Sequence, residues 1–437
     1  MRCLAEGVIP TLGFLIFRIS LAMSASSESK SSQSSHSSES NGVSYSGYQD
    51  ECSKELMCYF TNWATYRPHG WAYTIDNLQA NLCSYYIYAF ALLDGKTYKI
   101  VPAEPDLDIK KEYYKKFCKN VKAAGNKPIL AVGGWNDSKG TKWEELLKDP
   151  KKQDVFIKSA VEILRAHGFM GLELDYEYPG CPQGEFIDPK SKKRFTSFVK
   201  RIDEVFKDED LAIAIAIPAD SKKLTYCYEL KELDKNIDWF NVMGYDYHGT
   251  DEGKTYLHAP FKAQPSAPET LNVEYTIDFI LEQGVDPMNV ILGIPLYGKG
   301  NTLADPTKHT INSPTTGPSL EGKMTKAKGT LAFFEICLRK KNGWKVETKY
   351  QQKYYGRWIY KDDQWIGYDD KPELRRKVAL IENRGLGGGM IWALDFDDFR
   401  DRCKRGVSPL VTYLSNELLG NCRMNEMSSE EATVNVA

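Results

Sequence analysis

The segment Gly171-Leu172-Glu173-Leu174-Asp175-Tyr176-Glu177 constrains the fold of this chain more than any other. Acids alternate with large apolar residues, and a period of two is the signature of a β-strand with two different faces. This pattern suits a closed barrel, in which the acids point inward and the apolar face packs under helices. Carboxylates buried together raise one another's pKa, so at least one should hold a proton near neutrality. The alternative is a calcium site or a solvated edge strand, which would turn the apolar residues to the wrong side.

Seven further apolar, β-branched or aromatic runs recur along the chain, mostly separated by amphipathic segments. With the first segment they give expected strands at Leu56–Asn62, Leu82–Phe90, Pro128–Gly133, Gly171–Glu177, Leu211–Ile217, Trp239–Asp246, Val290–Pro295 and Gly389–Leu394. The clearest expected helices are Asp108–Ala124, Lys152–His167, Lys192–Phe206, Val273–Gln283 and Glu373–Arg384. Alternation of strand and helix over eight strands predicts an α/β fold, a (β/α)8 TIM barrel.

The rhythm breaks once, between the seventh strand and the last helix. Residues 298–370 contain strand-like pieces of their own, at Gly329–Leu338 and Arg357–Tyr368. We interpret this interval as a small α+β insertion domain beside the mouth of the barrel.

The two ends of the chain differ in composition from the barrel. The apolar stretch from Val8 to Met23 is followed by small residues and predicts a secretory signal over residues 1–24, and Arg18 argues against a membrane anchor. Residues 25–50 are rich in Ser and too poor in apolar residues to pack, which predicts a disordered linker. The barrel domain is assigned to residues 51–415 and a C-terminal tail to 416–437. We therefore expect a secreted, extracellular protein without a membrane partner.

Charge and cysteine usage narrow the possible partners. The net charge is −2, and basic clusters such as Lys190–Arg194 lie among acids, so no nucleic-acid partner is expected. Ten cysteines in a secreted chain suggest disulfides, although the spacing leaves their connectivity open. Removal of Cys3 with the signal leaves an odd number, so at least one cysteine is free or paired between chains. No Cys-x-x-Cys pair or histidine cluster has metal-ligand spacing, and neither a metal nor a cofactor is expected.

The carboxyl ends of the expected strands share one kind of chemistry. Indole rings stack on the apolar faces of sugars, while acids and tyrosines bind hydroxyl and amide groups and transfer protons. Each Trp alone is more often a core residue, but convergence at one end of a barrel favours a carbohydrate cleft. The side chains concerned are Asn62, Trp63, Phe90, Trp135, Asn136, Asp175, Glu177, Met243, Tyr245, Asp246, Tyr297 and Trp392.

Several motifs follow one another between Leu56 and Leu414. They are Cys-Tyr-Phe-Thr-Asn-Trp at 58–63, Tyr-Ala-Phe at 88–90, Gly-Gly-Trp-Asn at 133–136, Leu-Asp-Tyr-Glu-Tyr-Pro-Gly at 174–180, Met-Gly-Tyr-Asp-Tyr-His-Gly at 243–249, Pro-Leu-Tyr-Gly at 295–298 and Met-Ile-Trp-Ala-Leu-Asp at 390–395. Together they resemble glycoside hydrolase family 18, the chitinases and chitinase-like lectins. The resemblance implies the barrel with its inserted domain, and disulfides Cys58–Cys83 and Cys337–Cys403. It also implies chitin or chitooligosaccharides as partner, and we expect a monomer.

The resemblance also implies a mechanism and a role for each site residue. Asp175 and Glu177 lie two apart on one strand, on the same side of the substrate, so the nucleophile is the substrate's own N-acetyl oxygen. Glu177 is then the acid and base, Asp175 binds the acetamide N–H, Tyr245 holds the acetamide oxygen and Glu173 lies one layer below. Trp392 forms the floor, and the further sugar contacts are Tyr59, Trp63, Phe90, Gly134, Trp135, Met243, Asp246, Tyr297 and Met390. Asn136-Asp137-Ser138 is a glycosylation sequon at the expected rim.

The chain departs from the family pattern Asp-Gly-x-Asp-x-Asp-x-Glu. Met170 and Glu173 replace its first two acids, Lys299 stands where Arg is usual, and Ala327 stands where the insertion commonly offers a Glu to the sugar. We expect a chitinase that retains anomeric configuration, with turnover weakened by these changes. One rival interpretation is a chitin-binding lectin with little turnover. Another is a hydrolase for other N-acetylhexosaminyl glycans, which the row of aromatic strand ends disfavours.

Overall fold

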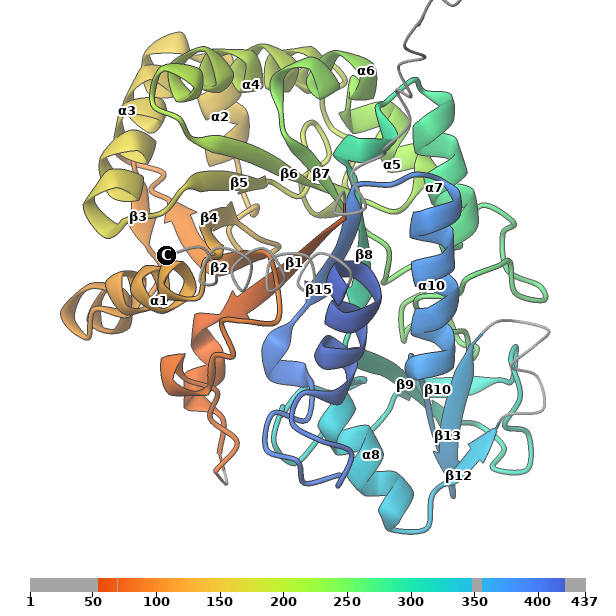
Figure 1. Ribbon diagram of the computed structural model, residues 1–437. Helices are drawn as coiled ribbons and strands as arrows, with labels where there is room; N and C mark the ends of the chain where they lie inside the picture. Colours follow the sequence, from red (N-terminus) through yellow and green to blue (C-terminus); the bar gives the residue numbers. More distant parts are fainter. Residues whose placement is uncertain (1–53, 69, 348–355, 421–437) are drawn as a thin grey trace, which may run out of the picture. The chain divides into compact units, whose positions relative to one another are not determined.

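Eight parallel strands close into a barrel in the computed structural model, which describes residues 54–68, 70–347 and 356–420 (Figure 1). The strand order is β1-β15-β8-β7-β6-β5-β4-β2, and pairing of β1 with β2 closes the ring. The antiparallel strand β3 (Ile100–Pro102) adds to the outer end of β2. The barrel strands are β1 (Glu55–Thr61), β2 (Tyr85–Leu93), β4 (Lys127–Gly133), β5 (Gly171–Asp175), β6 (Ala212–Pro218), β7 (Trp239–Met243), β8 (Val290–Pro295) and β15 (Gly388–Trp392).

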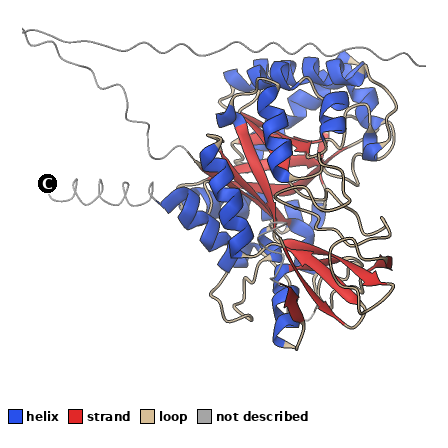
Figure 2. Ribbon diagram, turned by 90° about the vertical axis from the view of Figure 1, so that its right-hand side faces the viewer, coloured by secondary structure: helices blue, strands red, loops and turns tan. Residues whose placement is uncertain are grey.

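Helices cover the outside of these strands (Figure 2). A large apolar core fills the space between the two layers and includes the outward side chains Leu172, Leu174 and Tyr176. The predicted TIM barrel and its helices are therefore confirmed. The helices are α1 (Tyr113–Ala123), α2 (Lys142–Lys148), α3 (Pro150–His167), α4 (Ser191–Asp208), α5 (Ser221–Cys227), α6 (Leu230–Leu233), α7 (Val273–Glu282) and α10 (Lys371–Asn383).

The inner face of β5 carries the acids, as the alternation predicts. Parallel pairing places Ala131 of β4 and Ala214 of β6 on either side of Glu173. Small neighbours leave room for a long acidic side chain in a close-packed interior. The strand ends at Asp175, two residues earlier than predicted, and β7 ends at Met243 rather than Asp246. Glu177, Tyr245 and Asp246 therefore lie on the loops that follow these strands.

A six-stranded antiparallel sheet is inserted between β8 and α10, where the sequence predicts an α+β domain. The predicted strand Gly329–Leu338 is wrong beyond its first residues, because a helix begins at Phe333 and the carboxylate of Glu335 accepts the Ala332 N–H at its start. The run Arg357–Tyr368 is a hairpin of two strands that turns at Asp362. The elements are β9 (Tyr297–Leu303), β10 (Thr315–Pro318), β11 (Thr330–Ala332), α8 (Phe333–Lys341), β12 (Lys345–Glu347), β13 (Arg357–Lys361) and β14 (Gln364–Tyr368).

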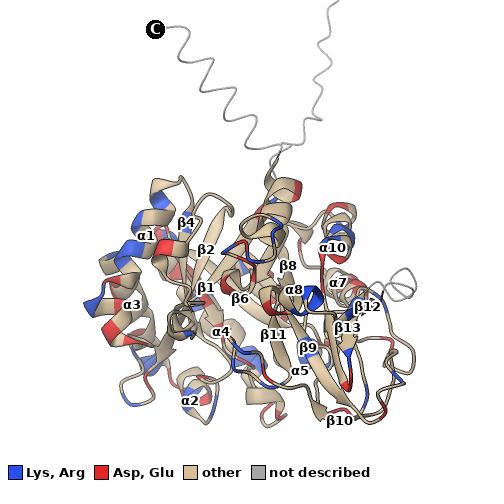
Figure 3. Cartoon of the chain, turned by 90° about the horizontal axis from the view of Figure 1, so that it is seen from below, with Lys and Arg blue, Asp and Glu red and all other residues tan. Residues whose placement is uncertain are grey.

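The predicted boundary at residue 415 falls inside a helix over 409–420. This helix continues past the boundary because Leu414, Leu418 and Leu419 are buried in the barrel core. The predicted signal, the Ser-rich linker and the last residues of the tail lie outside the described residues. Within the described chain, no helix is both long and apolar enough to span a bilayer. Lys and Arg are interspersed with Asp and Glu along α3, as expected of a solvated surface, whereas α1 carries lysines without acids (Figure 3).

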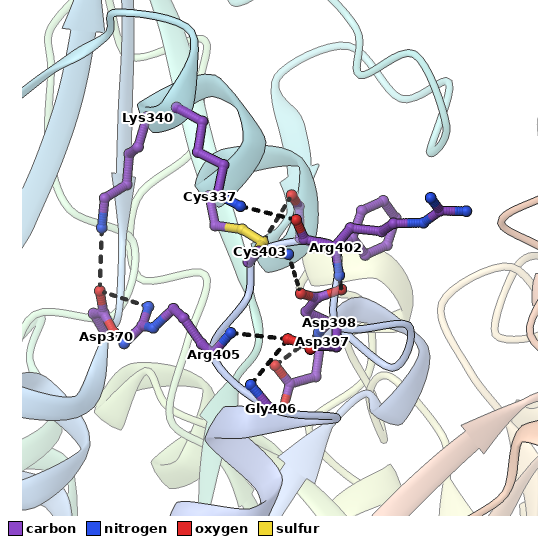
Figure 4. The surroundings of a disulfide bond; sticks show 12 residues. Cys337, Lys340, Asp370, Asp397, Asp398, Arg402, Cys403, Arg405 and Gly406 are labelled. Atoms are coloured by element: carbon purple, nitrogen blue, oxygen red, sulfur yellow. Dashed lines mark hydrogen bonds and ion pairs between the residues drawn. A yellow bond between two sulfur atoms is a disulfide. The ribbon is translucent and has the colours of Figure 1, made fainter.

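Within the described residues, three disulfides fasten loops to the barrel. Two are the pairs implied by the family resemblance, Cys58–Cys83 and Cys337–Cys403. Figure 4 shows the second, which joins α8 to the loop after β15, where the Asp398 carboxylate accepts the backbone N–H groups of Arg402 and Cys403. The third, Cys181–Cys227, ties the loop after β5 to the end of α5. Cys118 is a free, buried thiol.

Candidate active site

A cleft of about 890 Å³ opens at the carboxyl ends of the barrel strands. Its lining joins loops from most of the barrel to Lys299 of the inserted sheet. Of the residues predicted from the sequence, it contains Tyr59, Trp63, Phe90, Gly134, Trp135, Asn136, Asp175, Glu177, Met243, Tyr245, Asp246, Tyr297 and Trp392. Glu173 and Met390 are fully buried below this surface, so they act on the cleft only through the residues above them.

Aromatic rings form one side of the cleft. The Trp392 ring lies 4.9 Å from that of Tyr59 and 5.9 Å from that of Phe90, between centroids. Trp63 stacks on Phe90 at 5.8 Å and remains 41% exposed, and Trp135 is 46% exposed. Exposed indole faces on a rigid support are suited to stacking on sugar rings.

Glu173 is the lowest of the three acids and is completely buried. Its Oε1 accepts the side-chain N–H of Asn241 on β7 at 2.7 Å. Burial raises the pKa of Glu173 to about 7, and the hydroxyl of Tyr59 and the amide of Asn241 partly offset that rise. Met170 lies just before β5, at the end of the strand opposite Asp175, and its side chain is 36% exposed. The loss of an acid at that position therefore leaves the hydrogen bond of Glu173 intact.

Asp175 occupies the next layer, at the floor of the cleft. Burial, followed by the charges of Glu177 and Glu173, raises the pKa of Asp175 well above its ordinary value. Its buried Oδ1 has no hydrogen-bond partner among the described residues, so it is available to a donor from a ligand. Gly133 makes this packing possible, since a Cβ there would lie 2.3 Å from the carbonyl oxygen of Asp175.

Glu177 projects from a loop that several contacts hold in place. Its backbone N–H donates to the Ser138 hydroxyl at 2.9 Å, and its carbonyl accepts the Gln183 N–H at 2.7 Å. The Tyr178 hydroxyl donates to the Glu177 carboxylate at 3.1 Å. Burial is the main cause that raises the pKa of Glu177 to about 7. The carboxyl therefore holds a proton over the range in which an exposed glutamate has lost it.

Asp246 is the counterpart of Glu177 across the cleft. The Tyr297 hydroxyl donates to Oδ1 at 2.7 Å, His258 lies 3.2 Å from the same oxygen, and the Lys299 ammonium lies 3.2 Å from Oδ2. Although partial desolvation of this half-exposed side chain opposes its charge, these three partners lower the pKa of Asp246 below its ordinary value. Lys299 thus makes the ion pair at the position where the family usually has Arg.

Sequence reasoning missed three side chains that shape the site: Tyr178, Lys223 and His258. Tyr178 and Lys223 line the cleft, and the Lys223 ammonium lies 5.3 Å from the centre of the Tyr178 ring. Tyr178 directly follows Glu177, so its adjacency was a usable signal. Lys223 and His258 belong to α5 and to a long loop, away from the motifs. Ala327 lies outside the cleft lining, and Asn136 is exposed at its rim while Ser138 of the same sequon is buried.

Comparison with known proteins decides the family. The profile of "Glycosyl hydrolases family 18" matches residues 55–397. The chain belongs to glycosyl hydrolase family 18.

Its relatives include proteins named as chitinases and one described as a pseudo-chitinase. The chain is 37% identical over 368 residues to "Probable chitinase 10" of Drosophila melanogaster; the match covers 83% of this chain and only 16% of that protein. Catalytic domain 2 of the Ostrinia furnacalis Group II chitinase superposes with a TM-score of 0.82 at 35% identity, covering 84% of this chain and 97% of that domain. Human YKL-39, described as a pseudo-chitinase with retained chitooligosaccharide binding, superposes with a TM-score of 0.76 at 30% identity, covering 84% and 99%. Membership therefore establishes a chitinase or chitinase-like protein.

The buried stack predicts that the protein loses stability as pH rises. Between about pH 4.5 and pH 7 the folded protein keeps a proton on Glu173 that the unfolded chain has released, so the free energy of unfolding falls with pH. Glu173→Gln keeps an acceptor for Asn241 but cannot ionise. Its loss of stability from pH 5 to pH 8, measured by urea denaturation, should be smaller than the parent's by about 2–3 kcal/mol. The matched control is Glu162→Gln, at an exposed glutamate on α3. Parallel pH curves for Glu173→Gln and the parent would contradict the assignment.

Proposed function

We propose that this chain is a secreted chitinase that hydrolyses β-1,4-linked N-acetylglucosamine polymers with retention of configuration. The observation that carries the proposal is the buried Glu177 carboxyl, whose pKa burial raises to about 7, two residues after Asp175, whose buried Oδ1 has no hydrogen-bond partner among the described residues. A carboxyl that holds its proton at neutral pH can act as a general acid. Asp175 precedes Glu177 by two residues and lies on the same side of the substrate, and the Asp246 carboxylate across the cleft is engaged by Tyr297, His258 and Lys299, so we assign the nucleophile to the substrate.

The proposed reaction has two steps. Glu177 donates its proton to the glycosidic oxygen while the acetamide oxygen of the sugar attacks its own anomeric carbon, and the leaving sugar departs with that proton. Asp175 accepts the acetamide N–H and stabilises the cyclic oxazolinium ion, and the Tyr245 hydroxyl donates to the acetamide oxygen. In the second step a water molecule attacks the same anomeric carbon and opens the oxazolinium ring, while the ionised Glu177 takes a proton from that water. Two displacements at one carbon retain its configuration.

The setting of the enzyme follows from the rest of the chain. The predicted signal and the three disulfides support an oxidising, extracellular compartment. A glycan on Asn136, at the cleft rim, would narrow access to the polymer. We propose chitin or chitooligosaccharides as the partner, with a monomer as the working unit and no nucleic acid, membrane, metal or cofactor.

A chitin-binding lectin is the second candidate, because two features favour it. Glu173 and Lys299 replace the acid and the arginine of the family pattern inside the site. YKL-39, a structural relative, is described as binding chitooligosaccharides without being a true chitinase. The hydrogen bond from Asn241 to Glu173 and the ion pair of Lys299 with Asp246 show that both substitutions are accommodated, which favours the enzyme.

Glu177→Gln should abolish hydrolysis while preserving binding. The amide keeps the shape and the acceptor for Tyr178 but has no proton to give, and general acid catalysis typically supplies about 10²–10⁴-fold in rate. Release of a fluorophore from a chitotriose conjugate measures the first effect, and calorimetry with chitotetraose measures the second. Glu185→Gln, at an exposed glutamate on the same loop, is the matched control. A parental rate in Glu177→Gln would show that another group is the acid, and an inactive parent that binds the sugar would establish the lectin.

Trp392→Ala should weaken oligosaccharide binding far more than Trp344→Ala. Trp392 lines the cleft and is proposed as the platform under the sugar, whereas Trp344 lies in the inserted domain and packs against the Arg339 guanidinium. A desolvated aromatic platform is worth about 2 kcal/mol, or about 30-fold in Kd. Calorimetric titration of both variants with chitotetraose in the Glu177→Gln background checks the difference. Equal affinities for the two variants would rule out Trp392 as the floor.

A further inference from the structure

His258 is a buried histidine of the loop between β7 and α7 that links the barrel to the inserted sheet. Its residue exposure is 1%. Nδ1 lies 3.2 Å from Oδ1 of Asp246, and Nε2 lies 3.1 Å from the carbonyl oxygen of Tyr297, the first residue of β9. The Tyr297 ring packs beside the imidazole at 4.7 Å between centroids. The ring is therefore fixed between one carboxylate and one carbonyl.

Both neighbours of the imidazole can only accept hydrogen bonds. The carbonyl of Tyr297 requires a proton on Nε2. The Asp246 carboxylate already receives the Tyr297 hydroxyl on Oδ1 and the Lys299 ammonium on Oδ2, so it is ionised and cannot donate to Nδ1. A neutral ring would direct the lone pair of Nδ1 at a negative oxygen. Satisfying both contacts requires a proton on each nitrogen, which makes the ring an imidazolium.

We propose that His258 is a cationic positioning residue that holds Asp246 in its sugar-binding orientation and makes the affinity of the cleft depend on pH. This proposal rests on the proposed function only for the identity of the ligand. With two protons, His258 and Tyr297 together fix Oδ1 of Asp246, and Oδ2 is left beside Lys299 at the open cleft. When Nδ1 of His258 loses its proton, its lone pair faces the negative Oδ1 of Asp246. The two atoms then repel each other, and the Asp246 carboxylate turns away. The charged and titratable groups that face this unit are Asp246, Tyr297 and Lys299, with Tyr245 and Glu177 beyond them in the cleft.

The effect of His258 extends to the proposed acid. Burial, and after it the charge of Asp246, raise the pKa of Glu177. A change in the position of Asp246 therefore alters both sugar binding and the proton affinity of Glu177. Sugar affinity measured in the Glu177→Gln variant isolates the effect on binding, because this variant has no Glu177 proton to lose.

The protonation state of His258 is directly measurable in the full chain. Long-range ¹H–¹⁵N spectra of histidine-labelled protein should show both nitrogens of one ring protonated at about pH 7.5, where an ordinary histidine of pKa about 6.5 is neutral. That signal should be missing from His258→Asn. In Asp246→Asn it should change to a singly protonated ring at the same pH, which provides the assignment if His258→Asn does not fold. A His258 ring with a bare Nδ1 at about pH 7.5 would overturn the proposal.

Calorimetry with chitotetraose tests the consequence. Glu177→Gln should lose about tenfold in affinity once the pH is high enough to remove the second His258 proton, as expected for loss of a charge-assisted hydrogen bond. Glu177→Gln/His258→Asn should lack this tenfold loss and keep only the pH dependence that the remaining buried acids Glu173 and Asp175 impose. An identical pH dependence in the two proteins would overturn the positioning role. Failure of Glu177→Gln to bind chitotetraose at any pH would contradict the proposed function instead, and the spectra would then decide whether His258 is the cation that we infer.

Discussion

Desolvation of the acids on β5 is the constraint on which the rest of the site depends. The closed barrel leaves Glu173 no contact with water and Asp175 very little, so each must be protonated or supplied with donors. The alanines beside Glu173 give it space, Asn241 donates to it, and Gly133 lets the neighbouring backbone approach Asp175. Glu177 lies at the upper end of this stack and keeps a proton because its surroundings are equally dry. Burial of these acids destabilises their ionised forms. The same burial keeps a proton on Glu177 at the cleft, as the proposed role of general acid requires.

The surroundings shift the pKa values of two acids of the cleft in opposite directions. Burial raises the pKa of Glu177. For Asp246, contacts with His258, Lys299 and Tyr297 outweigh partial desolvation, so its pKa falls and the carboxylate stays ionised. Pairs of acids separated in this way are typical of sites that need one carboxyl to give a proton and another to bind. Replacement of the usual arginine by Lys299 preserves the positive charge but loses the planar fork of donors. His258 supplies a second, reversible positive charge to the same carboxylate.

Alternation and strand-end chemistry were sufficient to predict the barrel, the insertion and most of the cleft, because both depend on local patterns. The strand predicted at Gly329–Leu338 was wrong beyond its first residues, because one apolar run contains both a short strand and the start of a helix. Only the side chain of Glu335 marks the junction between them. The predicted boundary at 415 falls inside a helix, because the leucines that bury this helix become informative only once the barrel exists. The disulfide Cys181–Cys227 and the contact of His258 with Asp246 join segments that are distant or unpatterned in sequence, so spacing could not reveal them.

The proposed reaction is substrate-assisted and takes place in the cleft, next to Asp175 and Glu177. The most direct test is time-resolved ¹H NMR of chitotetraose hydrolysis by the purified chain, read at the anomeric proton of the first product before it mutarotates. The account predicts that the β-anomer forms first, since two displacements occur at one carbon. Initial formation of the α-anomer, or binding of the sugar without any product, would contradict it.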